Sequence, residues 1–225
     1  MIYVSADIET TGLDLDHTGN CSILQFAAII EDSSNPRPLD QLPKFSCFCY
    51  ESKISGESYA LALNSWIIKI LAEYEKDPRS IGQDRSRQPL PYYDNKQLPQ
   101  PSLMQFVAPT WMMPHMFIDW YRKQRAELDP TYVARKSGTK EVIDFAGKNF
   151  ATFDKRFLEA LPNWCKHVII RPRIIDPAVL FIDWKTDTVV PSLSECKKRA
   201  GLESTVTHDA VDDALDVIRV LRSKY

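Results

Sequence analysis

The acidic residues best placed to do chemistry in this sequence lie near its start, at the end of an alternating segment. Asp7 and Glu9 are two residues apart, so both project from one face of a strand, roughly 6.5–7 Å apart at Cα. Two carboxylates this close repel each other unless a cation or a proton lies between them. A solvated strand face is one interpretation. The other is a ligand site, favoured by their position at a strand's carboxyl end before a glycine turn.

A third acid, Asp213, belongs to the last predicted helix, over 208–223. The apolar stripe of that helix consists of Ala210, Ala214, Val217, Ile218 and Leu221. Asp213 lies at the edge of this stripe and points toward the core, where an unpaired charge is costly. A metal ion shared with Asp7 and Glu9 would supply its partner. Three other acids fall on the opposite, solvated face, and the first two suit a helix N-terminus: Asp209, Asp212 and Asp216.

The fourth acid, Asp154, opens a predicted helix over 151–161 that follows a short strand at 142–146. Alone it would be an ordinary first-turn acid, which the helix dipole favours. Together with the other three carboxylates it completes a set of hard oxygen ligands. Such ligands suit Mg²⁺ or Mn²⁺ rather than zinc.

His208 stands at the start of the last predicted helix, five residues before Asp213. A lone histidine is more often structural or simply exposed. Beside a cluster of carboxylates it is a candidate general base, because imidazole titrates near neutral pH.

An α/β arrangement would position these residues. Strands are predicted at 1–9, 23–30 and 44–50, and their short connections favour antiparallel pairing. Ser58 is the expected N-cap of the first helix. The other predicted elements are helices at 58–76, 115–128, 151–161, 177–182, 192–200 and 208–223, and strands at 142–146 and 168–175. This order indicates one domain, 1–225, with a mixed central sheet of three antiparallel and further parallel strands, flanked by helices.

Proline distribution sets one stretch apart. The chain of 225 residues has 15 prolines and only 7 glycines, and the prolines concentrate between about 78 and 114. No periodicity survives there, so a proline-rich insertion or long loop is predicted. Its aromatic residues leave two alternatives open, a disordered excursion or partial ordering against the body of the domain.

Composition narrows the classes of partner and compartment. With 28 Lys+Arg against 30 Asp+Glu the net charge is −2, too balanced for a protein that coats duplex DNA by bulk charge. A local site that grips one strand end stays compatible with this balance. The 5 scattered cysteines form neither a disulfide framework nor a zinc cage. With no apolar run of the ~18 residues that span a bilayer and no signal peptide, a cytoplasmic protein without a membrane partner is expected.

Three motifs, taken in order, resemble those of the DEDDh (DnaQ-like) 3′–5′ exonucleases of the RNase H-like superfamily. They are Asp7-Ile-Glu9-Thr-Thr-Gly-Leu13, Asn149-Phe-Ala-Thr-Phe-Asp154-Lys-Arg-Phe-Leu158 and His208-Asp-Ala-Val-Asp-Asp213. The resemblance covers 1–50 and 140–225 and is weak between them. The separation of the first two motifs is longer than in compact members, and the excess falls in the proline-rich stretch.

The resemblance implies an RNase H-like fold and two ions, Mg²⁺ or Mn²⁺, on four ligands: Asp7, Glu9, Asp154 and Asp213. Two such ions can clamp the attacking and leaving oxygens of an in-line phosphoryl displacement. His208 would take the proton from the attacking water, and nucleoside 5′-monophosphates would leave the 3′ ends of single-stranded DNA or RNA. By the same likeness, substrate contacts would come from Thr10, Thr11, Leu13, Asn149, Phe150 and Phe153. A core role stays open for at least one of the two phenylalanines, and homodimerisation also stays open.

Two other classes compete with this interpretation. Haloacid-dehalogenase phosphatases also begin with an acid-rich strand end and use a later Asp pair, which Asp212 and Asp213 imitate. However, Glu9 stands where a second Asp is needed, and His208 has no role in that chemistry. The non-enzymatic alternative is a nuclease-fold module that binds nucleic acid without turnover. Such modules usually lose at least one acid, and none is missing here.

Overall fold

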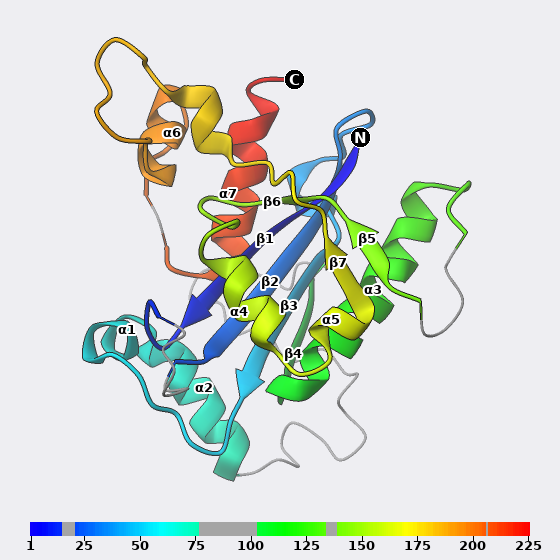
Figure 1. Ribbon diagram of the computed structural model, residues 1–225, viewed down its shortest axis with the longest axis vertical. Coiled ribbons are helices and arrows are strands. Elements are labelled where there is room, and N and C mark those ends of the chain that lie inside the picture. Colours follow the sequence, from blue (N-terminus) through cyan, green and yellow to red (C-terminus); the bar gives the residue numbers. More distant parts are fainter. Residues whose placement is uncertain (15–20, 77–102, 134–138, 206) are drawn as a thin grey trace.

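The alternation at the start of the chain produces β1 (Ile2–Thr10), an interior strand of a five-stranded sheet. The computed structural model describes residues 1–14, 21–76, 103–133, 139–205 and 207–225. In the sheet, the strand order is β4-β3-β2-β1-β6. The strands are β1 (Ile2–Thr10), β2 (Ile23–Asp32), β3 (Lys44–Tyr50), β4 (Leu103–Pro109) and β6 (Phe145–Ala146). Figure 1 shows this sheet with helices on both sides.

The predicted antiparallel arrangement of the first three strands is confirmed, and β6 runs parallel to β1. The register places Asp7 opposite Ala27 and shifts between Glu9 and Thr10, where β1 ends in an irregularity. A bulge of this kind bends a strand and re-aims its side chains, and bulges are frequent next to functional sites.

The predicted loop over 78–114 is wrong in its last third. Residues 103–109 form β4, which pairs in parallel with β3, and a 3-10 turn at Thr110–Met112 leads into the next helix. Proline density hid this strand, although Pro109 stands only at its end, where a sheet-edge strand tolerates it. The remainder of the predicted insertion, residues 77–102, lies outside the described residues.

Several predicted elements are shorter than expected or divided. The predicted helix 58–76 breaks at Asn64 into α1 and α2, and its N-cap is Glu57 rather than Ser58. The predicted strand 142–146 divides into β5 (Glu141–Ile143) and β6, and β5 pairs with β7 (Val168–Ile170) in a separate two-stranded sheet. The described helices are α1 (Ser58–Leu63), α2 (Ser65–Lys76), α3 (Met113–Leu128), α4 (Asp154–Ala160), α5 (Trp164–His167), α6 (Leu193–Arg199) and α7 (Ala210–Arg222), with a 3-10 helix η3 at Pro177–Phe181.

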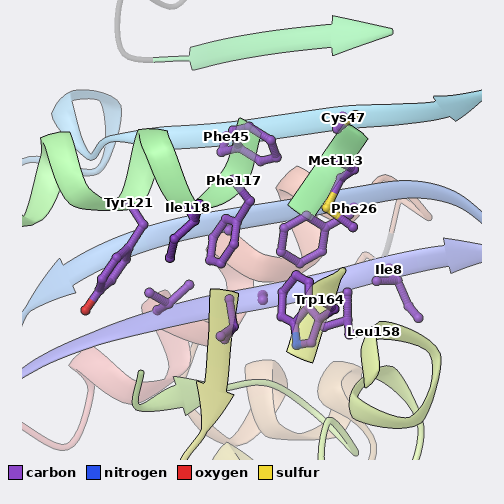
Figure 2. Close-up of a cluster of buried hydrophobic side chains, with 14 of the residues drawn as sticks. Ile8, Phe26, Phe45, Cys47, Met113, Phe117, Ile118, Tyr121, Leu158 and Trp164 are labelled. Carbon is purple, nitrogen blue, oxygen red and sulfur yellow. The ribbon is translucent and has the colours of Figure 1, made fainter. Parts of the chain in front are cut away.

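The two faces of β1 have different partners. Val4, Ala6 and Ile8 belong to the larger core, which α3, α4 and α5 cover. Figure 2 shows part of that core, in which Phe117 stacks on Trp164 with ring centroids 5.5 Å apart. This aromatic packing makes β1 a rigid base for whatever its last residues carry.

Helix α7 packs on the opposite face of the sheet, and α2 covers the same face nearer β3. The apolar stripe of α7 lies against Tyr3 and Ile29, and the Ser5 hydroxyl donates a hydrogen bond to the Ala214 carbonyl of α7 over 2.7 Å. Because side chains alternate along a strand, Asp7 and Glu9 share this face with Ser5. The packing of α7 therefore brings its first turn to the acids of β1.

Asp216 of α7 departs from the prediction of a solvated face. Its side chain is buried, at 3% exposure, because Lys197 of α6 and Arg219 both pair with its carboxylate. Within the described ranges, no helix is both long enough and apolar enough to cross a membrane.

Candidate metal-binding and catalytic site

Four carboxylates converge where β1 ends. Asp7 and Glu9 come from β1, Asp213 from the first turn of α7, and Asp154 is the first residue of α4. Asp7 lies close enough to the other three for their charges to act on it. In Figure 1 the arrowhead of β1 meets the beginnings of α4 and α7, which far-apart segments of the chain provide. The structure thus brings together the four acids singled out in the sequence.

Most of this cluster is buried and lacks a compensating cation from the described residues. Glu9, Asp154 and Asp213 are 8%, 2% and 8% exposed, and Asp7 is half-buried. The Oδ1 atoms of Asp154 and Asp213 accept no hydrogen bond. Among the described residues no cation forms a salt bridge with any of the four, whereas Asp216 nearby has two. An ionised carboxylate buried in this way is unfavourable unless something external compensates it.

The pKa values of the four carboxyl groups reflect the cost of burying their charges. Burial, followed by repulsion from Asp213, raises the pKa of Glu9 to about 7, and burial with repulsion from Asp216 does the same for Asp213. Burial and the charge of Asp154 raise the pKa of Asp7 well above its ordinary value. Burial also raises the pKa of Asp154, although the backbone N–H of Ile8 partly offsets it. The four groups cannot all ionise near neutral pH without a cation among them.

His208 stands at the open side of the cluster. It is exposed, and a ring nitrogen lies within 4.8 Å of carboxylate oxygens of Glu9 and Asp213. Its φ of 54° is in the left-handed region, which non-glycine residues rarely adopt and which often marks functional sites. Asp209, the next residue, accepts a hydrogen bond from the Val211 N–H over 2.8 Å and caps α7, as predicted for an acid at this helix start.

The donor set fits a hard divalent cation. Ligand atoms of Glu9, His208 and Asp213 lie within 4.8 Å of one another, and the orphaned oxygens of Asp154 and Asp213 are acceptors that a cation would satisfy. Carboxylate oxygens are the ligands that Mg²⁺ and Mn²⁺ prefer. The arrangement can therefore hold a metal ion and present an exposed imidazole beside it.

The turn after β1 uses both of its threonine hydroxyls internally. Thr10 Oγ1 donates to the Gly12 carbonyl over 2.7 Å, and Thr11 Oγ1 accepts from the Ser22 N–H over 2.9 Å. Both threonines are buried, so their side chains shape the turn instead of projecting toward a substrate. Leu13, in contrast, is 67% exposed beside the cluster.

Sequence reasoning missed two residues that hold this turn. The Glu57 N–H donates to the Thr11 carbonyl over 2.8 Å, while its carboxylate accepts from the Leu13 N–H over 2.9 Å. Asn64, buried at the break between α1 and α2, donates to the Thr10 carbonyl over 3.0 Å. The residue in the sequence that could have pointed to this contact is Gly56, next to Glu57. An added Cβ at Gly56 would approach the Thr11 carbonyl oxygen to 2.1 Å, so the chain passes very close to the turn there.

The second motif divides into core and surface residues. Asn149 is exposed with a φ of 59°, and its N–H donates to Asp176 over 3.0 Å. Phe150 is completely buried and stacks on Phe145 with centroids 4.9 Å apart, so it has no free face for a base. Phe150 thus has the core role that the sequence left open for at least one of the two phenylalanines, because tertiary packing uses its ring. Phe153 is only half-buried, next to Asp154.

Comparison with known proteins adds evidence on the fold. No family model and no curated protein sequence matches the chain. Among solved structures it is similar to cell-death related nuclease 4 (CRN-4), with a TM-score of 0.53 and 12% identity over 98% of this chain and 62% of that chain. It also aligns with E. coli Exonuclease I in complex with a dT13 oligonucleotide, with a TM-score of 0.49 and 15% identity over 99% of this chain and 40% of the other. The chain thus spans less than two thirds of either protein.

The likeness to CRN-4 and the strand order lead to one conclusion about architecture. This chain has three antiparallel strands, a parallel strand beside the first, and helices on both faces of the sheet. The chain has a mixed α/β fold of the RNase H-like type.

Proposed function

We propose that this protein is a metal-dependent 3′–5′ exonuclease that degrades single-stranded nucleic acid to nucleoside 5′-monophosphates. The observation that carries the proposal is the group of buried, unpaired carboxylates around the end of β1, with an exposed histidine at its edge. The fold shared with the nuclease CRN-4 supports it. Because the chain spans only 62% of CRN-4, the activity, polarity and substrate are all part of the proposal.

The four carboxylates would hold the ions: Asp7, Glu9, Asp154 and Asp213. Two divalent ions, Mg²⁺ or Mn²⁺, would when bound activate a water molecule and neutralise charge on the scissile phosphate. The raised pKa values of Glu9 and Asp213 would fall on binding, since a nearby positive charge favours the ionised form. Burial excludes competing water and strengthens each of these electrostatic contacts.

His208 would act as the general base. Its ring is exposed at the mouth of the cluster, where it can take a proton from the attacking water and release it to solvent. An imidazole suits this role because its ordinary pKa lies near neutral pH.

Leu13 and Phe153 are the predicted contact residues with side-chain surface available to a terminal nucleotide. Leu13 is exposed on a turn that Glu57 and Asn64 hold in place, and Phe153 is half-buried beside Asp154. A base can stack on an exposed ring face or lie against an aliphatic side chain. The buried predicted residues would then support the site from behind: Thr10, Thr11 and Phe150. The exposed Asn149 would contact the nucleic-acid strand.

The test uses 5′-labelled single-stranded DNA and RNA of identical sequence, with Mg²⁺ or Mn²⁺. The expected result is a ladder shortened from the 3′ end with mononucleotide products, lost in Asp213→Asn. Asp212→Asn is the matched control, because Asp212 is exposed on the same turn of α7, and it should retain activity. Internal cleavage would contradict the proposed polarity. Binding of either strand without turnover would favour the non-enzymatic module instead.

A further inference from the structure

A buried lysine lies behind the candidate site and outside the predicted chemistry. Lys197 of α6 is buried, and its Nζ forms an ion pair with Asp216 of α7. The same Nζ donates a hydrogen bond to the backbone carbonyl of Thr205. One ammonium group therefore joins α6, α7 and the segment that leads into His208.

The described residues between α6 and His208, 200–205 and 207, have few other anchors. Helix α6 ends at Arg199, Gly201 beyond it has a φ of 72°, and the Leu202 N–H donates to the Lys197 carbonyl over 2.9 Å. Glu203, Ser204 and Thr205 are exposed, so the burial of apolar surface contributes little to holding them.

The space between this segment and α7 is polar rather than packed. A cavity of about 500 Å³ lies there, lined by Lys197, Thr205, Thr207, Asp212, Asp216 and Arg219. Thr207 Oγ1 donates to Asp212 over 3.1 Å and provides a second tether, on the surface. Lys197 and Asp216 are the buried polar side chains at this cavity, and such groups are strongly positional, because losing one partner leaves the other unsatisfied.

We propose that Lys197 is a positioning residue for His208. By holding the Thr205 carbonyl and Asp216 together, it fixes the backbone at Thr205, three residues before His208, whose ring nitrogen lies within 4.8 Å of carboxylate oxygens of Glu9 and Asp213. Lys197 contacts neither substrate nor metal in this role, which rests on the function proposed above. Its positive charge also acts on Asp213, whose pKa it lowers.

The chain offers a matched control in Arg219. Its Nη1 pairs with the other carboxylate oxygen of Asp216 over 2.7 Å, from a side chain that is 40% exposed. Arg219 has no hydrogen bond to residues 200–205 or 207, the part before His208 that the structure describes. Loss of Arg219 removes one ion pair of Asp216 and leaves the connection to Thr205 intact. Loss of Lys197 removes both its ion pair with Asp216 and its hydrogen bond to the Thr205 carbonyl, while Arg219 still compensates the Asp216 charge.

The experiment compares Lys197→Met with Arg219→Met in the full chain. Hydrogen exchange measures the amides of residues 203–208, and kinetics with a single-stranded oligonucleotide separate kcat from KM. Lys197→Met should speed exchange there without changing β1–β3, and lower kcat by roughly 10–100-fold with little change in KM, the range of other supporting residues. Arg219→Met should keep kcat within about twofold, because Arg219 is partly exposed and Lys197 still pairs with Asp216.

A double-mutant cycle tests whether Lys197 acts through the histidine. If it does, Lys197→Met should have little further effect on kcat in a His208→Ala background, since the two changes remove one function. Equal losses in both backgrounds, or unchanged exchange of 203–208, would overturn the inference. If Lys197→Met does not fold, Lys197→Gln, which keeps a donor without the charge, is held to the same criteria. An inactive wild-type protein would refute the proposed function, while hydrogen exchange would still report on the Lys197 contact.

Discussion

Asp213 and Asp216 are both buried and lie one turn apart on α7, yet only one has a partner. Lys197 and Arg219 pair with Asp216, whereas Asp213 has an oxygen without any hydrogen bond and forms no salt bridge with a described residue. A buried acid with a cation from its own chain is part of the fold. A buried acid without one marks a place where a cation from solution can bind.

The same difference appears at the two ends of the helix. At its C-terminal end, Arg222 donates to Glu31 of β2 over 2.7 Å and to the Arg37 carbonyl over 2.7 Å, although Glu31 is completely buried. At its N-terminal end, Asp213 joins the other unpaired acids of the site. Helix α7 is thus anchored at one end and chemically incomplete at the other, as expected of an element that combines a structural and a functional role.

The largest effect, on activity, is expected at Asp213, the acid whose proposed partner is a cation from solution. Asp213→Asn should lower exonuclease activity by more than about 10²-fold, because losing a ligand should exceed the cost of losing a residue that only supports one. The metal-free variant should melt no lower than wild type, since the change removes a repelled charge. Activity assays and thermal melts check both parts. If the variant loses activity because it unfolds, Asp213 has a structural role like that of Asp216.

Removal of a cation that belongs to the chain should lower stability, whereas removal of the unpaired acid Asp213 should lower activity. Arg222→Met leaves Glu31 buried and uncompensated, so the free energy of unfolding should fall by about 3–5 kcal/mol, measured by urea denaturation. Arg222→Met with Glu31→Gln should recover part of that loss, because the orphaned charge is gone. A loss below about 1 kcal/mol would mean that the pair behaves as a surface contact.

The pH dependence of the metal-free protein sharpens the comparison. Glu9 and Asp213 have pKa values near 7 in the folded protein, against about 4 in an unfolded chain. The folded state therefore binds more protons between these values, and its stability should fall as the pH rises from about 4 to 7. Mn²⁺ should reverse the trend, because it binds the deprotonated groups. Melting temperatures across this range, with and without Mn²⁺, make the test.

The smallest effect is expected for Phe153 of the second motif, with Phe150 as its structural contrast. Phe153→Ala should raise KM by the equivalent of about 1–3 kcal/mol if the ring stacks on a base, and leave kcat nearly unchanged. Phe150→Ala should instead destabilise the protein by about 3–5 kcal/mol, because Phe150 is buried against Phe145. An unchanged KM in Phe153→Ala would remove Phe153 from the substrate-binding residues.

Local periodicity accounts for the parts of the site that could be predicted. Alternation along β1 placed Asp7 and Glu9 on one face, and the stripe of α7 aimed Asp213 inward. The same helical pattern placed Asp216 in solvent, because it contains no information about a lysine on α6. Interactions between elements distant in sequence decided that residue.

Two further differences have physical reasons of the same kind. Phe150 and Phe153 fit equally well as core or contact residues, and only the position of Phe145 beneath the motif distinguishes them. Glu57 and Asn64 support the turn after β1 from a helix start and a helix break, where no periodic pattern identifies them. The 103–109 strand was hidden because prolines at its flanks suggested a loop.

Calorimetric titration of Mn²⁺ into the wild-type protein, Asp213→Asn and Asp212→Asn tests the central claim most directly. The unpaired carboxylates predict saturable binding of two ions to wild type and to Asp212→Asn, with proton release near pH 6.5 as Glu9 and Asp213 ionise. Binding to Asp213→Asn should be at least about tenfold weaker. Equal affinities in all three proteins, or no saturable binding at millimolar Mn²⁺, would contradict the assignment of these acids to a metal site.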